Sequence, residues 1–479
     1  MLTFQDFQSE LNNIPAFLSK AIGQHTQSDM YKVAKDADEY DKEKNTTIYN
    51  YVRTIFTSTG SEVIDFTASN NRIASNFFHR LNTQRRTYSL GNGVSFTKHK
   101  TKAKDADGQD ITIDETKQRL GDDFDTQLNA LADKALIHGL SFGFWNLDKL
   151  YVFPLTEFVP LWDEDNGALR AGIRFWRLSE DKPATVVLYE EDGYTKYRSK
   201  KGSKGFDLEL VEEKKPYKTI YRVSEADGEE IIGGENYGVL PIKPMWGSKL
   251  HQSTLVGIKS AIDSYDLIRS GFANDLTDVS QVYWILSNCS GMTDSELARF
   301  RDRLKIQHIA VADMDNSDVK PYTQEIPFQA RQAYLDSIRS GIYEDFGGLD
   351  VHVIAAGATN DHIDAAYQPL DENADDFEFQ VIKFVQQILQ LMGIDDVPVF
   401  KRNRISNQSE QVDMVVKEAE WLDEETILQK LPNISVDEVS SILAKKHLEE
   451  LTRFKKEDFE DNSDNLAQNA AESTETENQ

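Results

Sequence analysis

The sequence predicts an α+β protein with several units, and three observations support that fold class. Apolar residues recur at helical spacing through about residue 140 and again after residue 253. Between these regions, β-branched runs alternate with turn signals such as Glu191-Asp192-Gly193, which is typical of an antiparallel meander. The length of 479 residues exceeds that of one ordinary domain, so we expect more than one hydrophobic core.

The first unit is predicted to be mostly helical, with amphipathic helices over residues 67–81 and 124–137. The tripeptide Gly91-Asn92-Gly93 predicts a turn between them, and the charged residues 98–108 predict a loop. The meander that follows is expected to contain strands over residues 150–153, 173–176, 185–189 and 217–223.

A long helix is predicted from residue 253 to about residue 279, with Ser253 as its cap. Its apolar residues form one stripe that a partner must bury, namely Leu255, Ile258, Ile262, Tyr265, Ile268, Phe272 and Leu276.

A small β-α-β-β unit is predicted over residues 281–327. Thr293 and Glu296 form a capping box at the start of its helix. Its strands are expected over residues 281–286, 308–312 and 319–326. A unit this small cannot bury an adequate core alone, so we expect it to pair with a neighbour.

The remaining chain is predicted to be helical with one conspicuous loop. A second long helix covers residues 328–346 and ends at Gly347. Small residues then predict a loop within residues 351–366, before a third helix over residues 376–392. Further helices are expected over residues 409–421, 425–431 and 435–454, followed by a polar, acidic and disordered tail over residues 455–479.

Composition excludes several classes of protein. Lys and Arg total 53 against 81 Asp and Glu, and the net charge of −28 disfavours binding to nucleic acid through the general field. The single cysteine, Cys289, excludes an intramolecular disulfide and a zinc site built from cysteines. The dipeptide Gly-Lys is absent, which excludes a P-loop ATPase. No apolar run approaches the ~20 residues of a membrane span, and no signal peptide is evident, so an intracellular protein is expected.

Four groups of residues suggest chemistry, and each has a simpler explanation. Asp361-His362-Ile363-Asp364 resembles a metal-binding cluster or a solvated loop. Asp122-Asp123-Phe124-Asp125 resembles an acidic nuclease site, or a helix start with favourable charges. Cys289 lacks a His partner in the sequence, which favours a structural thiol over a nucleophile. The basic run from Lys98 to Lys104 fits an exposed loop better than a nucleic-acid site. A structural or assembly role is therefore favoured over an enzyme.

Several segments carry a resemblance to a known family by their order and spacing. They are Asn70-Asn71-Arg72-Ile73 with Thr87-Tyr88-Ser89-Leu90-Gly91, the segment from Ala135 to Gly143, the segment from Tyr151 to Asp163, Leu240-Pro241-Ile242 with Ile262-Asp263-Ser264-Tyr265-Asp266, and the segment from Glu425 to Pro432. Together these segments resemble the portal proteins of tailed bacteriophages, of the type found in phages of Gram-positive hosts. Relatives often place Ser-Gly before an aliphatic pair where this chain has Ala356-Gly357-Ala358.

The resemblance implies a ring of about a dozen subunits around a DNA channel. It also divides the chain into named parts. These are a wing (1–252), a stem helix (253–280), a clip (281–327), a second stem helix (328–350), a tunnel loop (351–366), a wing return helix (367–408), a helical crown (409–454) and a disordered acidic tail (455–479).

The function that the resemblance implies is structural, with no catalysis and no cofactor. The ring would sit at one capsid vertex of the virion after assembly in the host cytoplasm, and double-stranded DNA would enter during packaging and leave during ejection. Its partners would be the terminase large subunit, the head–tail adaptor, and the major capsid and scaffold proteins, with no membrane. We expect Gly357, Asn360, Asp361 and His362 to lie nearest the DNA. The alternatives are a metal-dependent nuclease of the packaging machinery and a connector ring without a packaging role.

Overall fold

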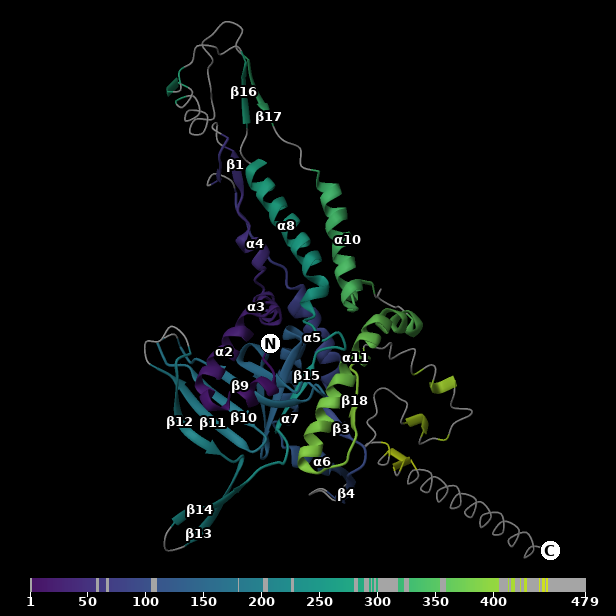
Figure 1. Ribbon diagram of the computed structural model, residues 1–479. Helices are drawn as coiled ribbons and strands as arrows, with labels where there is room; N and C mark the ends of the chain where they lie inside the picture. The colour runs from purple at the N-terminus through teal and green to yellow at the C-terminus, as the bar shows by residue number, and fades with distance from the viewer. Residues whose placement is uncertain are drawn as a thin grey trace, which may run out of the picture.

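Two long helices project from a body of sheets and helices in the computed structural model (Figure 1). The structure describes residues 2–56, 60–65, 69–104, 110–179, 181–200, 206–224, 228–279, 283–287, 318–322, 327–353 and 359–404, with residues 293, 295, 296 and 299 and a few separate positions between 412 and 446. The predicted mixture of helices and strands is confirmed.

The strands of the predicted meander are found, but they do not form one sheet, because residues 150–153 and 217–223 pair elsewhere. Residues 173–176 and 185–189 lie in a five-stranded antiparallel sheet in the order β12-β11-β10-β9-β8. Its strands are β8 (Phe158–Trp162), β9 (Leu169–Trp176), β10 (Thr185–Glu190), β11 (Gly193–Ser199) and β12 (Leu208–Lys215). Along β10, Val186 and Leu188 face one hydrophobic cluster while Val187 and Tyr189 face another. This alternation shows that both faces of the sheet are covered.

The chain begins with four helices, of which the first two cover one face of this sheet. They are α1 (Phe4–Ser9), α2 (Ile14–Gln27), α3 (Asp29–Asp41) and α4 (Thr46–Asn50), with a 3-10 turn η1 (Leu11–Asn13) after α1. Phe17, Leu18 and Ile22 of α2 are fully buried against the strands. The predicted helical start of the chain is therefore confirmed for these residues.

The second core of the body surrounds a three-stranded sheet in the order β15-β6-β7. Its elements are β6 (Leu140–Asn146), β7 (Lys149–Pro154), the 3-10 turn η2 (Leu155–Glu157), β15 (Ile242–Trp246), α6 (Glu115–Leu120) and α7 (Phe124–His138). Helix α11 (Asn360–Met392) packs on this sheet, and a Cβ atom at Gly143 would overlap the ring of Phe384. A glycine is therefore required where α11 approaches β6 most closely.

Four short antiparallel strand pairs lie outside these two sheets. They are β1 (Thr54–Phe56) with β2 (Glu62–Ile64), β3 (Val94–Phe96) with β18 (Pro398–Phe400), β4 (Lys100–Lys104) with β5 (Asp110–Asp114), and β13 (Lys218–Ser224) with β14 (Gly228–Glu235). The prediction of a loop over residues 98–108 is wrong for β4, because residues 100–104 pair with residues 110–114 of β5.

The helix predicted over residues 67–81 is misplaced. Helix α5 runs instead over Phe77–Leu90, and residues 69–76 are not helical. The amide of Asn71 donates to Oδ1 of Asn274 at 2.6 Å, and the amide of Ile73 donates to Oγ of Ser270 at 2.9 Å. These amides donate to side chains of α8 instead of to carbonyls of their own segment. The apolar spacing of residues 67–81 therefore predicted a helix that begins too early.

The bounds of the two projecting helices agree closely with those predicted from the sequence. They are α8 (Leu255–Val279) and α10 (Phe328–Phe346), which pack together in antiparallel fashion (Figure 1). Gly347 ends α10 in the left-handed conformation with φ of 69°, as predicted. We call α8 and α10 the helix pair. Beyond its tip, β16 (Tyr283–Ser287) and β17 (Asp318–Tyr322) form an antiparallel hairpin.

The third long helix is much longer than predicted. It begins at Asn360, not at residue 376, and includes Pro369. A short 3-10 turn, η3 (Val351–Val353), precedes it. Residues 360–366, predicted as part of a loop, are therefore helical. The strand predicted over residues 308–312, Cys289, Gly357 and the tail over residues 455–479 lie outside the described residues.

Candidate channel site and helix pair

The predicted channel residues lie at the start of α11, except for Gly357. Asn360 is the first residue of the helix, and Asp361 and His362 are exposed in its first turn. Oγ1 of Thr359, the N-cap residue, lies 3.1 Å from Nδ1 of His362. The negative charge of Asp361 is favourable at this helix end, because the peptide dipoles point their positive ends there.

The suggested metal sites are not assembled in the part of the chain that the structure describes, where no group of three His, Cys, Asp or Glu side chains could hold an ion. Asp364 instead pairs with Arg404 at 2.9 Å. Asp125 pairs with Lys117 at 2.9 Å and accepts a hydrogen bond from the amide of Val94. The acidic run before α7 is therefore a helix start, which was the simpler of its two explanations.

The apolar stripe of α8 is covered only near the body. Leu255, Ile258 and Ile262 are each 1% exposed. Further along the helix, the ring centroids of Phe272 and of Phe328 on α10 lie 5.7 Å apart. Leu276, one turn later, is 55% exposed. The stripe thus continues beyond the contacts that the described residues supply.

A buried polar network fixes the base of the helix pair to the body. Nζ of Lys259 on α8 donates to Oδ2 of Asp263 at 2.8 Å and to the hydroxyl of Tyr40 on α3 at 3.0 Å. Nδ2 of Asn45 donates to Oδ2 of Asp266 at 2.8 Å.

Burial and hydrogen bonding shift the pKa values of two groups in this network. Burial raises the pKa of Asp266, which is fully buried, because its charged form loses water. Burial lowers the pKa of Lys259, but hydrogen bonds to Asp263 and Tyr40 outweigh that effect and raise it to about 12. Lys259 therefore stays charged, and the network anchors α8 to α3 electrostatically.

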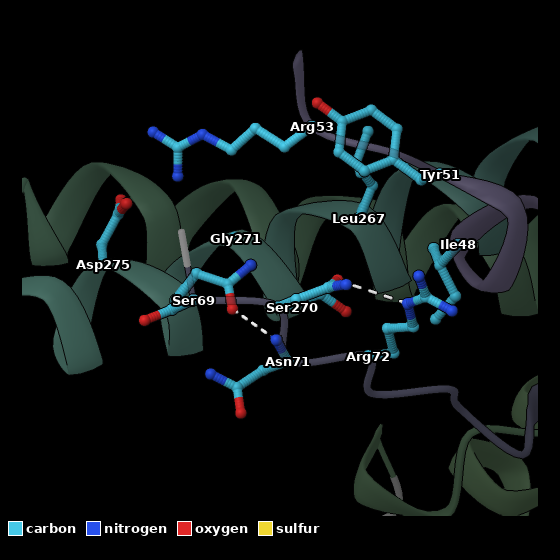
Figure 2. A pocket seen from close by; sticks show the side chains of 12 residues that line it. Ile48, Tyr51, Arg53, Ser69, Asn71, Arg72, Leu267, Ser270, Gly271 and Asp275 are labelled. Carbon is cyan, nitrogen blue, oxygen red and sulfur yellow. Dashed lines mark hydrogen bonds between the residues drawn. The ribbon is translucent and has the colours of Figure 1, made fainter. Parts of the chain in front are cut away.

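A pocket of about 280 Å³ lies where residues 69–72 cross α8 (Figure 2). Figure 2 shows Tyr51, Arg53 and Arg72 around the surface of α8 that carries Leu267 and Gly271. The lining is polar and basic on the side of the early chain. This flank of the helix pair is opposite to the flank formed by α10 (Figure 1).

A charged cluster that the sequence did not predict holds the chain after β18 against α11. Arg402 pairs with Asp371, Asp375 and Glu378, and Arg404 pairs with Asp364 and Asp371. The acids recur at helical spacing along one side of α11. That signal is visible in the sequence only if the helix is extended back to Asn360, across Pro369.

No described helix combines the length and the low charge that a membrane-spanning segment requires.

The sequence model of one protein family matches residues 23–464 of this chain. The family is described as phage portal protein, SPP1 Gp6-like, and the match covers most of the chain. The chain therefore belongs to this family of bacteriophage portal proteins, and the resemblance stated above is confirmed.

Two relatives show the same family. The portal protein of Bacillus phage SPP1 is 24% identical over 392 residues, which cover 76% of this chain and 73% of the relative. The portal protein of Clostridium phage phiCD119 is 28% identical over 214 residues, which cover 43% of this chain. The match spans only about half, 48%, of that second relative.

A solved structure of the neck of a native GTA particle, computed with C12 symmetry, is similar over 66% of this chain and 81% of the matched chain. Its TM-score is 0.38 and its sequence identity is 10%, a similarity too low to support an argument about fold or function.

Proposed function

We propose that this chain assembles into a ring of about a dozen subunits at one capsid vertex, and that double-stranded DNA passes through it. The ring serves packaging and ejection, and it binds the terminase large subunit, the head–tail adaptor and capsid proteins. The ring has no catalytic activity of its own. Membership of the portal family supports this proposal over the nuclease alternative.

The observation that carries the proposal is the uncovered apolar surface of the helix pair. Phe328 on α10 is 57% exposed and Leu276 on α8 is 55% exposed. On the opposite flank, Phe56 of the hairpin β1–β2 is 77% exposed. Large exposed apolar surfaces indicate contact with another molecule. In a ring, each subunit presents one flank to the neighbour on one side and the other flank to the neighbour on the other side.

Charge is complementary across these two flanks. The flank of the early chain carries Arg53 and Arg72 beside the pocket of Figure 2. Helix α10 carries the exposed acids Asp336 and Glu344, whereas its arginines Arg331 and Arg339 are already paired with Asp275 and Asp350 of the same chain. Head-to-tail packing of the helix pairs therefore brings basic residues toward acidic ones.

The parts of the chain take the following roles in this proposal. The helix pair is the stem, the hairpin β16–β17 belongs to the clip outside the capsid, and the segment before α11 is the channel loop with Gly357. The net charge of −28 per chain disfavours tight binding to the phosphates, so DNA slides instead of adhering.

Imaging of the purified full-length protein in negative stain, with its mass measured in solution, tests the proposal. We expect closed rings with a central hole. The variant Phe328→Asp places a charge in the proposed contact and should leave folded monomers. The matched variant Leu178→Asp changes an exposed apolar residue of the body and should still form rings. A monomeric unaltered protein, or cleavage of DNA by it in the presence of magnesium, would contradict the proposal.

A further inference from the structure

Helix α11 changes direction along its length (Figure 1), and Pro369 lies inside it. Proline has no amide hydrogen, so the carbonyl of Ala365 loses its helical donor, and the ring forces the turns apart. We assign the bend to Pro369. The helix thus has a first arm, residues 360–368, and a second arm, residues 370–392.

Arg404 contacts both arms of the bent helix. Its Nη1 donates to Oδ1 of Asp364 on the first arm at 2.9 Å. Its Nη2 donates to Oδ2 of Asp371 on the second arm. Its Nε donates to the hydroxyl of Tyr88 on α5 at 2.8 Å. The planar guanidinium therefore spans the proline and ties both arms to the body.

Aromatic contacts hold this guanidinium in place. The rings of Tyr88 and Tyr367 stack at 5.7 Å, and the guanidinium of Arg404 lies 5.5 Å from the ring of Tyr367. The hydroxyl of Tyr88 donates to Oδ1 of Asp371 at 2.6 Å. Burial and this hydrogen bond raise the pKa of Tyr88 to about 12, so the hydroxyl keeps its proton at neutral pH.

Arg402, two residues earlier, differs in one decisive respect. Its described ion pairs all lie on the second arm, with Asp371 at 3.0 Å, with Glu378 at 2.9 Å and with Asp375. It fastens the chain to α11 without crossing Pro369. The two arginines therefore form a natural pair of test and control.

We propose that Arg404 is a positioning residue that fixes the bend of α11 and thereby the direction from which the chain enters this helix. The inference rests on the proposed function, in which the segment entering α11 is the channel loop. Because Arg404 also lies just before the proposed crown, it links the placement of the crown to that of the channel loop. Movement of the crown therefore changes the constraint on the channel loop, and movement of the channel loop changes the constraint on the crown.

Hydrogen exchange on the full-length protein tests the bend directly. In Arg404→Gln, the amides of residues 363–368 should exchange about tenfold faster, which corresponds to about 1.4 kcal/mol. Asp364→Asn changes an exposed residue, leaves the core intact, and should accelerate the same amides about threefold. Arg402→Gln should leave them unchanged. Equal protection in Arg404→Gln and in the unaltered protein would overturn the proposal.

DNA packaging into procapsids tests the link to the channel. Arg404→Gln rings should package less DNA than Arg402→Gln rings of equal assembly. Faster exchange combined with normal packaging by Arg404→Gln would overturn the link between the bend and the channel loop. If the unaltered protein formed no ring, the proposed function would fail, whereas the exchange result would still decide the role of Arg404 in the bend.

Discussion

The body and the helix pair bury their apolar residues in different ways. In the body, Phe142 of β6 and Phe384 of α11 are completely buried by elements of the same chain. In the helix pair, the exposed fraction of the side chain rises along α8 from 1% at Leu255 to 55% at Leu276. Two helices can cover each other on one side only, and residues 69–73 cover part of the other side of α8, but the described chain leaves Leu276 and Phe328 largely exposed.

This difference separates two sets of requirements on the sequence. The body needs residues that fit each other within one chain, as the glycine at residue 143 beside Phe384 illustrates. Under the proposed function, the helix pair needs a surface that is stable when alone and also apolar enough to bind another copy. Substitutions should therefore affect folding in the body and assembly in the helix pair.

The largest expected effect is on the body. Phe384→Ala should lower the free energy of unfolding by about 3–5 kcal/mol, because it leaves a cavity where the ring packs over β6. Phe328→Ala, at an exposed position of α10, should lower it by less than about 1 kcal/mol. Urea unfolding at a protein concentration low enough to dissociate any ring measures both values. Similar losses for the two variants would show that the helix pair is not uncovered in the monomer.

The contrast also explains how much of the fold was predictable. The bounds of α10 follow from its stripe and from Gly347, because local signals agree there with the final packing. The bounds of α8 likewise follow from its apolar stripe. The start of α11 could not be predicted, because Pro369 and the acids around it are typical of a loop. The residues that stabilise that helical segment are distant in sequence, namely the arginines after β18, and Tyr88 and Leu349, which bury its apolar side.

The candidate site was less predictable than the fold. Asp361 and His362 were predicted to lie in a loop, whereas they lie in the first helical turn of α11. Residues 69–73 were predicted as a helix, although their amides bond to α8. Both errors arise where distant residues supply the hydrogen bonds, which periodicity within one segment does not reveal.

The second prediction concerns the junction between the two regions. Asn45→Ala should lower the free energy of unfolding by about 2–3 kcal/mol, because the buried carboxylate of Asp266 loses a donor and α4 loses its cap. The control Asn71→Ala removes an exposed side chain while its backbone bond to Asn274 remains. It should cost less than about 0.5 kcal/mol. Equal costs in thermal or urea unfolding would show that the junction does not anchor the pair.

The smallest expected effect is a difference in the sign of the pH dependence between the two regions. In the body, Asp396 accepts hydrogen bonds from Thr116 and from the amides of Lys98 and Val397. Burial alone would raise its pKa, but these bonds outweigh burial and lower it to about 2. At the junction, burial raises the pKa of Asp266.

These opposite shifts make opposite contributions to stability. The stability from Asp396 is present above its unfolded pKa, near 4, and is lost as pH falls toward about 2, so Asp396→Asn should cost about 2 kcal/mol at pH 7 and less at pH 3. Asp266 contributes stability at low pH that is lost as pH rises through its raised pKa. Asp266→Asn should therefore be best tolerated at pH 7, where the charged form is costly to bury. Urea unfolding of both variants at the two pH values measures the costs. A cost of Asp266→Asn that grows from pH 3 to pH 7, in parallel with that of Asp396→Asn, would show that the carboxylate at the junction is stabilised in the same way as the one in the body.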